Sequence, residues 1–137
     1  MTVMEDPKVT ILNLLKENWS LEFTPRFTTD WYDWKARSPT VVVQHQVTPV
    51  SFAGLGGLKR RHDAEYAIHV FSLSEDERWK MKEEVDRIIQ VKRSNPGTDL
   101  EFVSVRNWVD LDEVDVSPKI YHSRILTGLV YFKTSAT

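Results

Sequence analysis

The side chains that could carry chemistry in this chain are few and far apart in the sequence. There is no cysteine, which excludes thiolate nucleophiles, disulfides and zinc–thiolate sites. No serine lies in a Gly-x-Ser-x-Gly nucleophile motif, and no two histidines have the His-x-x-x-His spacing of a helical metal site. The histidines are His45, His62, His69 and His122. We therefore expect no catalytic residue, no bound metal and no cofactor, and we predict that the protein is not an enzyme.

Two of these histidines lie on predicted strands that follow each other along the chain. His45 belongs to a strand predicted over 40–50, and His69 to one predicted over 65–73, both rich in β-branched or aromatic residues. Paired strands can bring two such side chains together as cross-strand neighbours. We expect a pair held by hydrogen bonds rather than an acid–base pair. A small ligand-binding α+β domain that uses this region remains an alternative function.

A glycine-rich, basic loop is predicted between these two strands, over 51–64. Its Gly-x-Gly-Gly run differs from a P-loop, which needs Gly-x-x-x-x-Gly-Lys-Ser/Thr between a strand and a helix. Because this loop joins two strands, no helix N-terminus is available to bind an anion. The far end of the loop carries Lys59, Arg60 and Arg61. We interpret them either as a solvated hairpin tip or as a contact to an acidic surface or nucleic acid.

Four carboxylates fall within six residues after a strand predicted over 100–109. They are Asp110, Asp112, Glu113 and Asp115, in a predicted loop. Such a cluster could bind calcium, but the central glycine and the position-12 glutamate of an EF-hand loop are absent. We expect a solvated acidic loop or a partner contact rather than a metal site.

Aromatic residues are frequent, with five Trp, four Tyr and six Phe. Trp31, Tyr32 and Trp34 are clustered between predicted elements. One interpretation is a loop that folds its aromatic side chains over the end of the core. Another is an exposed anchor for a partner protein, since Trp and Tyr are enriched at interfaces. A base-stacking platform is disfavoured because two aspartates in this segment repel phosphate.

The bulk properties indicate one ordinary globular domain. A chain of 137 residues with 28% charged and 41% hydrophobic residues can bury a core of its own. The formal net charge of −2 gives no general attraction to nucleic acid or to anionic membranes. No apolar run approaches the roughly 20 residues of a membrane-spanning helix, and the first residues do not resemble a secretory signal. We therefore expect a soluble protein without a membrane partner.

Two helices are predicted from local signals. Asp6 and Pro7 are typical of a helix start, and the first helix is predicted over 7–18. Ser74 and Glu77 have the spacing of a capping box, and the second helix is predicted from there to about Arg93. Its apolar stripe at spacings of three and four residues comprises Trp79, Met81, Val85, Ile88 and Ile89.

The predicted order of elements is helix, strand, strand, helix, strand, strand. The last strand, over 121–134, is apolar on both faces, so we expect it to be central or covered by another subunit. Hairpin-like connections favour antiparallel pairing. The prediction is one α+β domain over 1–137, a two-layer sandwich of a mainly antiparallel four-stranded sheet with two helices on one face.

This order of elements resembles the tail-terminator (tail-completion) proteins of long-tailed phages and archaeal tailed viruses. The resemblance covers most of the chain as a pattern. It is carried by Ile11-Leu12-x-x-Leu15 in the first helix, the strand over 40–47, the strand over 65–74 leading into the helix over 77–91, and the last strand over 126–132. It implies a structural virion protein, made in the host cytoplasm, that forms a hexameric ring in the neck of the particle. The ring caps the tail tube, stops its polymerisation and joins it to the head-completion proteins.

The same resemblance implies no small-molecule substrate, and DNA only as a passage through the ring. A ring needs two different surfaces that meet between neighbours. The residues at 59–61 and the acidic run at 110–115 have opposite charge. If they lie on opposite flanks of the domain, each subunit can present its basic residues to the acidic run of its neighbour. The aromatic residues at 31–34 would supply apolar contact area. A small nucleic-acid-binding module that uses 59–61 remains an alternative function.

Overall fold

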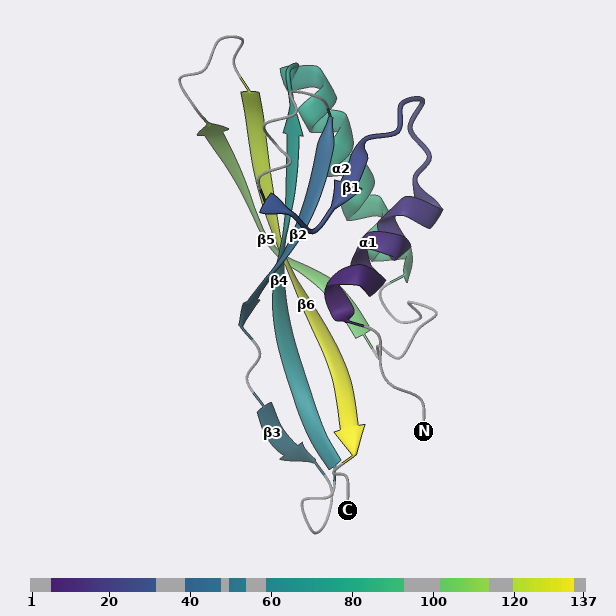
Figure 1. The fold of residues 1–137 in the computed structure, drawn as a ribbon, viewed down its shortest axis with the longest axis vertical. Coiled ribbons are helices and arrows are strands. Elements are labelled where there is room, and N and C mark those ends of the chain that lie inside the picture. Colours follow the sequence, from purple (N-terminus) through teal and green to yellow (C-terminus); the bar gives the residue numbers. More distant parts are fainter. Residues whose placement is uncertain are drawn as a thin grey trace.

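The computed structural model describes residues 6–31, 39–47, 50–53, 59–92, 102–113 and 120–134, which form an α+β fold (Figure 1). The predicted fold class and the order of the main elements are confirmed. Two short strands, β1 and β3, were not predicted. The elements are α1 (Pro7–Asn18), β1 (Arg26–Thr28), β2 (Thr40–Val47), β3 (Val50–Ala53), β4 (Lys59–Ser72), α2 (Glu75–Lys92), β5 (Phe102–Glu113) and β6 (Ile120–Thr134).

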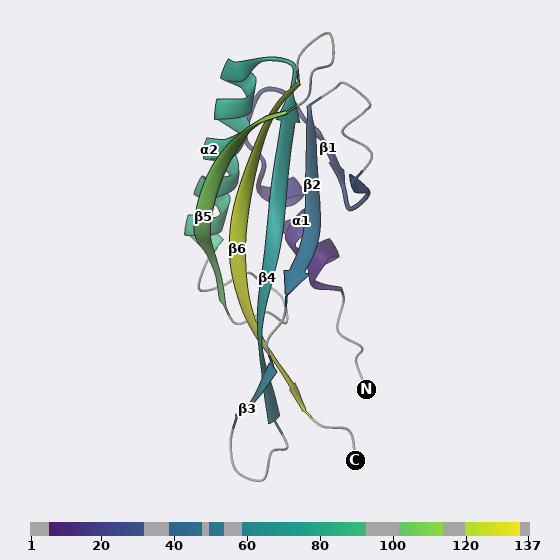
Figure 2. The same ribbon diagram turned by 90° about the vertical axis from the view of Figure 1, so that its left-hand side faces the viewer.

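The described strands form one sheet in the order β1-β2-β4-β6-β5, and β3 pairs with β4. The four long strands β2, β4, β6 and β5 pair antiparallel, and only the three-residue β1 runs parallel to its neighbour β2 among the described pairs. Strand β6 lies between β4 and β5, which agrees with its apolar character on both faces. Figure 2 shows the twist of this sheet, with β5 along one edge.

Both helices pack on one face of the sheet and enclose the main core. Alternation along β4 directs Tyr66, Ile68 and Val70 to this face. The buried members of this core are Ile11, Leu14, Leu15, Val41, Val43, Ala64, Tyr66, Ile68, Val70, Met81, Val85, Ile88, Ile89, Ile125 and Leu129. Burying each large aliphatic side chain contributes about 1.5–3 kcal/mol, so this face supplies most of the stabilisation that the fold requires.

The predicted apolar stripe of α2 is correct except for Trp79, whose side chain is 55% exposed. Trp79 precedes Met81 by two residues, which places the two side chains about 200° apart around the helix. Trp79 therefore lies on the solvent side, where Lys82 approaches its ring to 5.4 Å.

Capping groups fix the starts of both helices. The Asp6 carboxylate accepts a hydrogen bond from the backbone N–H of Lys8 at 3.0 Å, as predicted. At α2, Ser74 Oγ accepts from the N–H of Glu77 at 3.4 Å, which is one half of the predicted capping box. The other half passes through Ser72: its hydroxyl accepts from the N–H of Ser74 at 3.2 Å and donates to the Glu77 carboxylate at 2.6 Å.

A buried carboxylate ties the end of α1 to α2. Glu84 Oε2 accepts from the backbone N–H of Ser20 and, at 2.7 Å, from its hydroxyl. Arg87 donates from Nε to Glu84 Oε1 at 2.7 Å and from Nη2 to the carbonyl of Asn18 at 2.9 Å. Burial alone would raise the pKa of Glu84, but the hydrogen bonds from Arg87 and Ser20 hold this pKa below its ordinary value.

The longest strands extend past the rest of the sheet and form an arm with β3. Pairing of β2 with β4 ends at Glu65, and pairing of β5 with β6 ends at Val130. Beyond these residues, β3 pairs with residues 59–62 of β4, which pair in turn with residues 131–134 of β6. We call these three segments the arm. It projects beyond α1 at one end of the molecule (Figures 1 and 2).

The arm corrects the prediction of a loop over 51–64. Residues 50–53 and 59–64 are strands, and the glycines between them lie outside the described residues. The prediction was wrong because glycine and basic residues have low strand propensity, whereas here the last strand β6 provides a long partner. Tertiary pairing of this kind overrides local preference.

Candidate interaction surfaces

The basic residues predicted as an interface lie at the start of β4, on the arm. Arg60 pairs through its backbone with Phe52 of β3 and with Lys133 of β6. Arg60 and Arg61 are both exposed, and strand alternation places them on opposite faces of the arm. Arg61 forms an ion pair with Asp63 at 3.1 Å. An exposed ion pair of this kind contributes only about 0–1 kcal/mol, so it stabilises the arm little.

The arm concentrates positive charge at one end of the molecule. Lys59, Arg60, Arg61 and Lys133 give its segments a formal charge of +4, and they contain no carboxylate. Counting the adjacent Asp63 still leaves +3. Because the whole chain carries −2, the residues outside the arm segments together carry −6. The charge is therefore unevenly distributed although the net charge is small.

The predicted acidic residues lie at the other end, on a strand rather than in a loop. Strand β5 continues through Asp110, Asp112 and Glu113, which pair by backbone with Ser123, Tyr121 and Ile120 of β6. This corrects the predicted strand end at 109, and the reason is again that β6 is long enough to continue the pairing. Asp115 lies outside the described residues. In Figure 1 this end of β5 is at the top, and the arm is at the bottom.

Trp31 packs against its own domain. Its half-buried ring makes edge-on contacts with His69, Phe71 and His122, at centroid distances of 4.7, 5.6 and 6.0 Å. Phe71 belongs to a second apolar cluster with Val42 and Ile120, on the sheet face turned away from the helices, and Trp31 packs against this cluster. Trp31 therefore covers part of the core. Tyr32 and Trp34, the other predicted aromatic contacts, lie outside the described residues.

The histidine pair in the structure differs from the predicted one. His69 Nδ1 lies 2.7 Å from His122 Nε2, and His69 Nε2 lies 3.1 Å from Gln44 Oε1. His45 lies instead opposite Tyr66, with ring centroids 5.0 Å apart. The register places His45 and His69 on opposite faces of the sheet, so the expected contact between them was wrong.

Hydrogen bonding assigns the protons in this cluster. If the Gln44 oxygen accepts from His69 Nε2–H, then His69 Nδ1 carries the lone pair that accepts from His122 Nε2–H. Burial, together with the electrostatic effects of His122 and Arg124, lowers the pKa of His69 to about 3. Burial likewise lowers the pKa of His122 to about 4, with contributions from Arg124 and Arg78. Both imidazoles are therefore neutral at pH 7 and act as structural groups.

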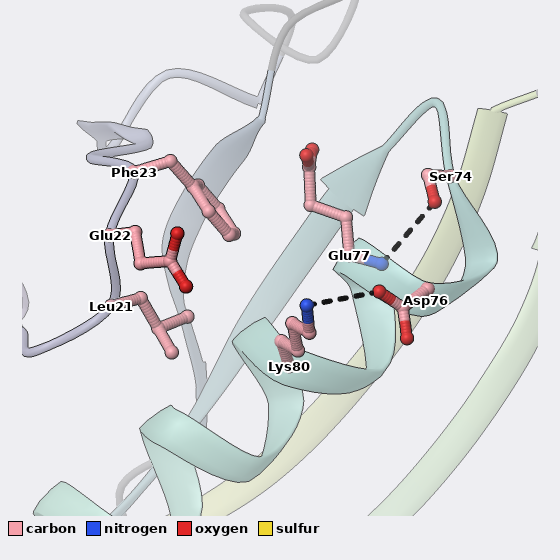
Figure 3. A pocket seen from close by; sticks show the side chains of 7 residues that line it. All are labelled: Leu21, Glu22, Phe23, Ser74, Asp76, Glu77 and Lys80. Carbon is pink, nitrogen blue, oxygen red and sulfur yellow. Dashed lines mark hydrogen bonds and ion pairs between the residues drawn. The ribbon is translucent and has the colours of Figure 1, made fainter.

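A pocket that the sequence did not indicate lies at the start of α2 (Figure 3). The start of α2 is at the end of the molecule away from the arm (Figure 1). Its volume is about 330 Å³, near the lower limit for ligand pockets. It is lined by Leu21, Glu22, Phe23, Ser74, Asp76, Glu77 and Lys80. Its only sequence signal is the acidic first turn of α2, which a helix dipole alone would also favour.

The described residues contain no metal-binding arrangement: no group of three or more His, Asp or Glu side chains is placed to hold an ion. Neither described helix has the length and apolar character required to cross a membrane. No protein-family model matches the chain, and no match is found among curated proteins.

Proposed function

We propose that this protein is a structural virion subunit similar to a tail terminator. In this role it assembles into a hexameric ring that caps the tail tube and joins it to the head-completion proteins of the neck. The proposal is supported by the α+β fold and the order of its main elements, because the resemblance to tail terminators rests on that order. Shape and surface charge carry this function, and no chemical step is involved.

The observation that carries the proposal is the separation of charge along the molecule. The arm is basic, whereas the acidic positions of β5 and the pocket at α2 lie at the opposite end (Figure 1). One chain does not bring these ends together, but neighbouring copies can. Contact between two different surfaces is the heterologous interface that a closed ring requires.

Charge alone does not supply the affinity of such an interface. Exposed ion pairs contribute about 0–1 kcal/mol each, so they determine register and choice of partner more than strength. Apolar area must contribute the rest. Trp31 is packed against its own core, but Trp79 is 55% exposed and Leu73 is 42% exposed. Trp79 has the residue type and exposure of an interface hot spot, and it replaces Trp31 as the aromatic candidate.

The proposal is tested by removing charge from the arm. The double variant Arg60→Ser/Arg61→Ser should melt within a few degrees of wild type, because both side chains are exposed. Its self-association should weaken in light scattering at high protein concentration. Lys16→Ser/Arg26→Ser is the matched control, because it removes two exposed positive charges away from the arm. Equal association of the two double variants would contradict the proposal.

The exposed arginines of the arm favour nucleic-acid binding as a second candidate function. Arg60 and Arg61 are side chains of the type that contacts the phosphates of nucleic acid. Binding of this type weakens steeply with salt, by about 0.9 decades per decade of salt for each phosphate neutralised. Tight, salt-sensitive DNA binding by wild type that is lost in Arg60→Ser/Arg61→Ser would favour this function over the ring.

A further inference from the structure

The pocket at the start of α2 combines an apolar wall with a rim of carboxylates. Leu21 and Phe23 form the apolar wall, and Glu22 lies between them with its carboxylate directed toward α2 (Figure 3). On the facing helix, Asp76 is engaged by Lys80 at 3.1 Å. In the described part of the chain, Glu22 has no ion-pair partner.

The balance of charge in this pocket favours a cation. Glu22, Asp76 and Glu77 contribute three negative charges and Lys80 one positive charge, which gives −2. The N-terminus of α2 contributes only about half a positive charge, so the carboxylates dominate. An arginine fits both parts of the lining, since its aliphatic stem packs on apolar surface and its guanidinium binds a carboxylate in a bidentate manner.

We propose that this pocket receives the arm of a second copy of the chain, with Arg60 or Arg61 placed against Glu22. The arm is the strongest concentration of positive charge in the described residues, and both arginines are exposed. The pocket is lined by the start of α2, and the arm and the start of α2 lie at opposite ends of the long axis (Figure 1), so an arm does not reach the pocket of its own chain. The contact is therefore between different surfaces of two copies.

This inference rests on the proposed ring and specifies one of its interfaces. Repeated contact between an arm and the next pocket produces a closed ring if the rotation between neighbours closes, and an open filament if it does not. Pairwise affinity tests the contact between the arm and the pocket, whereas particle shape tests whether the copies close into a ring. The two are therefore measured independently.

A charge-swap cycle tests the contact. Self-association of the full chain is measured by sedimentation for wild type, Arg60→Glu/Arg61→Glu, Glu22→Arg, and the combination of all three changes. We expect the arm variant and the pocket variant each to weaken association about tenfold or more, because attraction becomes repulsion. The combined variant should recover most of the lost affinity, because it restores opposite charges across the interface. Glu83→Arg, at an exposed position of α2 outside the pocket, is the control and should not be rescued by the arm changes.

Failure of recovery in the combined variant would overturn arm docking. Arm docking would also be overturned if Glu22→Arg weakens association and Arg60→Glu/Arg61→Glu does not. In that case another part of the neighbouring copy would occupy the pocket. Electron microscopy of the same samples tests the ring separately. If wild type forms rings but the combined variant does not recover affinity, the proposed function stands and this interface is wrong. If the combined variant recovers affinity but the samples form filaments and no rings, arm docking is supported and the ring is contradicted.

Discussion

His69 and His122, which are 53 residues apart in the sequence, place two imidazole nitrogens 2.7 Å from each other under the ring of Trp31. The pair connects β4 to β6 on the sheet face turned away from the helices. Both rings are buried and neutral, and a proton added to either one would lie close to Arg124. This cluster therefore tolerates no added charge.

We predict that the free energy of unfolding falls as the pH falls below the ordinary histidine pKa of 6.5. The unfolded chain binds protons on these histidines near that pH, whereas the folded chain resists protonation until about pH 4 for His122 and about pH 3 for His69. The contribution of the two neutral histidines to the free energy of unfolding is therefore fully present above pH 6.5. It decreases as the pH falls toward their folded-state pKa values. Between pH 7 and pH 5 the loss should be about 2–4 kcal/mol, measured by urea unfolding.

The double variant His69→Leu/His122→Leu should lose most of this pH dependence, because it removes both buried imidazoles. His45→Leu is the control: His45 is exposed and lies on the other face of the sheet, so its removal should leave the dependence intact. An unchanged pH dependence in the double variant would show that other groups cause it.

Val85 tests the placement of α2 on the sheet. It is fully buried in the main core, so Val85→Asp would place a carboxylate among apolar side chains. We expect a loss of about 3–5 kcal/mol in thermal or urea unfolding. Trp79→Asp, on the exposed side of the same helix, should cost about 1 kcal/mol or less. Similar losses in the two variants would mean that the helix faces the sheet differently.

The link between Glu84 and Ser20 predicts a second, smaller effect on stability. Glu84→Gln removes the charge that orders Ser20 and Arg87, and should cost about 1–3 kcal/mol at pH 7. Because the folded-state pKa of Glu84 is lowered, its contribution exists above the ordinary glutamate pKa and disappears as the pH falls through the folded value. The difference between the variant and wild type should therefore shrink in acid. A difference that is constant with pH would contradict this role, and Glu83→Gln on the exposed side is the control.

The sequence predicted well those features that depend on local chemistry. Asp6 and Ser74 cap helices where expected because a cap involves residues only two or three positions away. Alternation along β4 also places Tyr66 and Ile68 on one face, since the two-residue period of a strand is intrinsic to the backbone, but the packing of the helices determines that this face is the main core.

Features that depend on distant partners were missed. His122 was not identified as the partner of His69, because the register of β4 against β6 is not encoded near either residue. The sequence predicts loops where β4 and β5 continue, for the same reason: the continuation of both strands depends on pairing with the long strand β6. The pocket joins residues 21–23 to the start of α2, more than 50 positions away, and no local pattern marks it.

The proposed ring at the neck of a virus particle can be imaged by electron microscopy of the mature particle, together with the purified protein at high concentration. We expect a sixfold ring at the head-proximal end of the tail that contains this chain. A protein that stays strictly monomeric and is absent from the particle, or one that forms a compact twofold dimer, would contradict it.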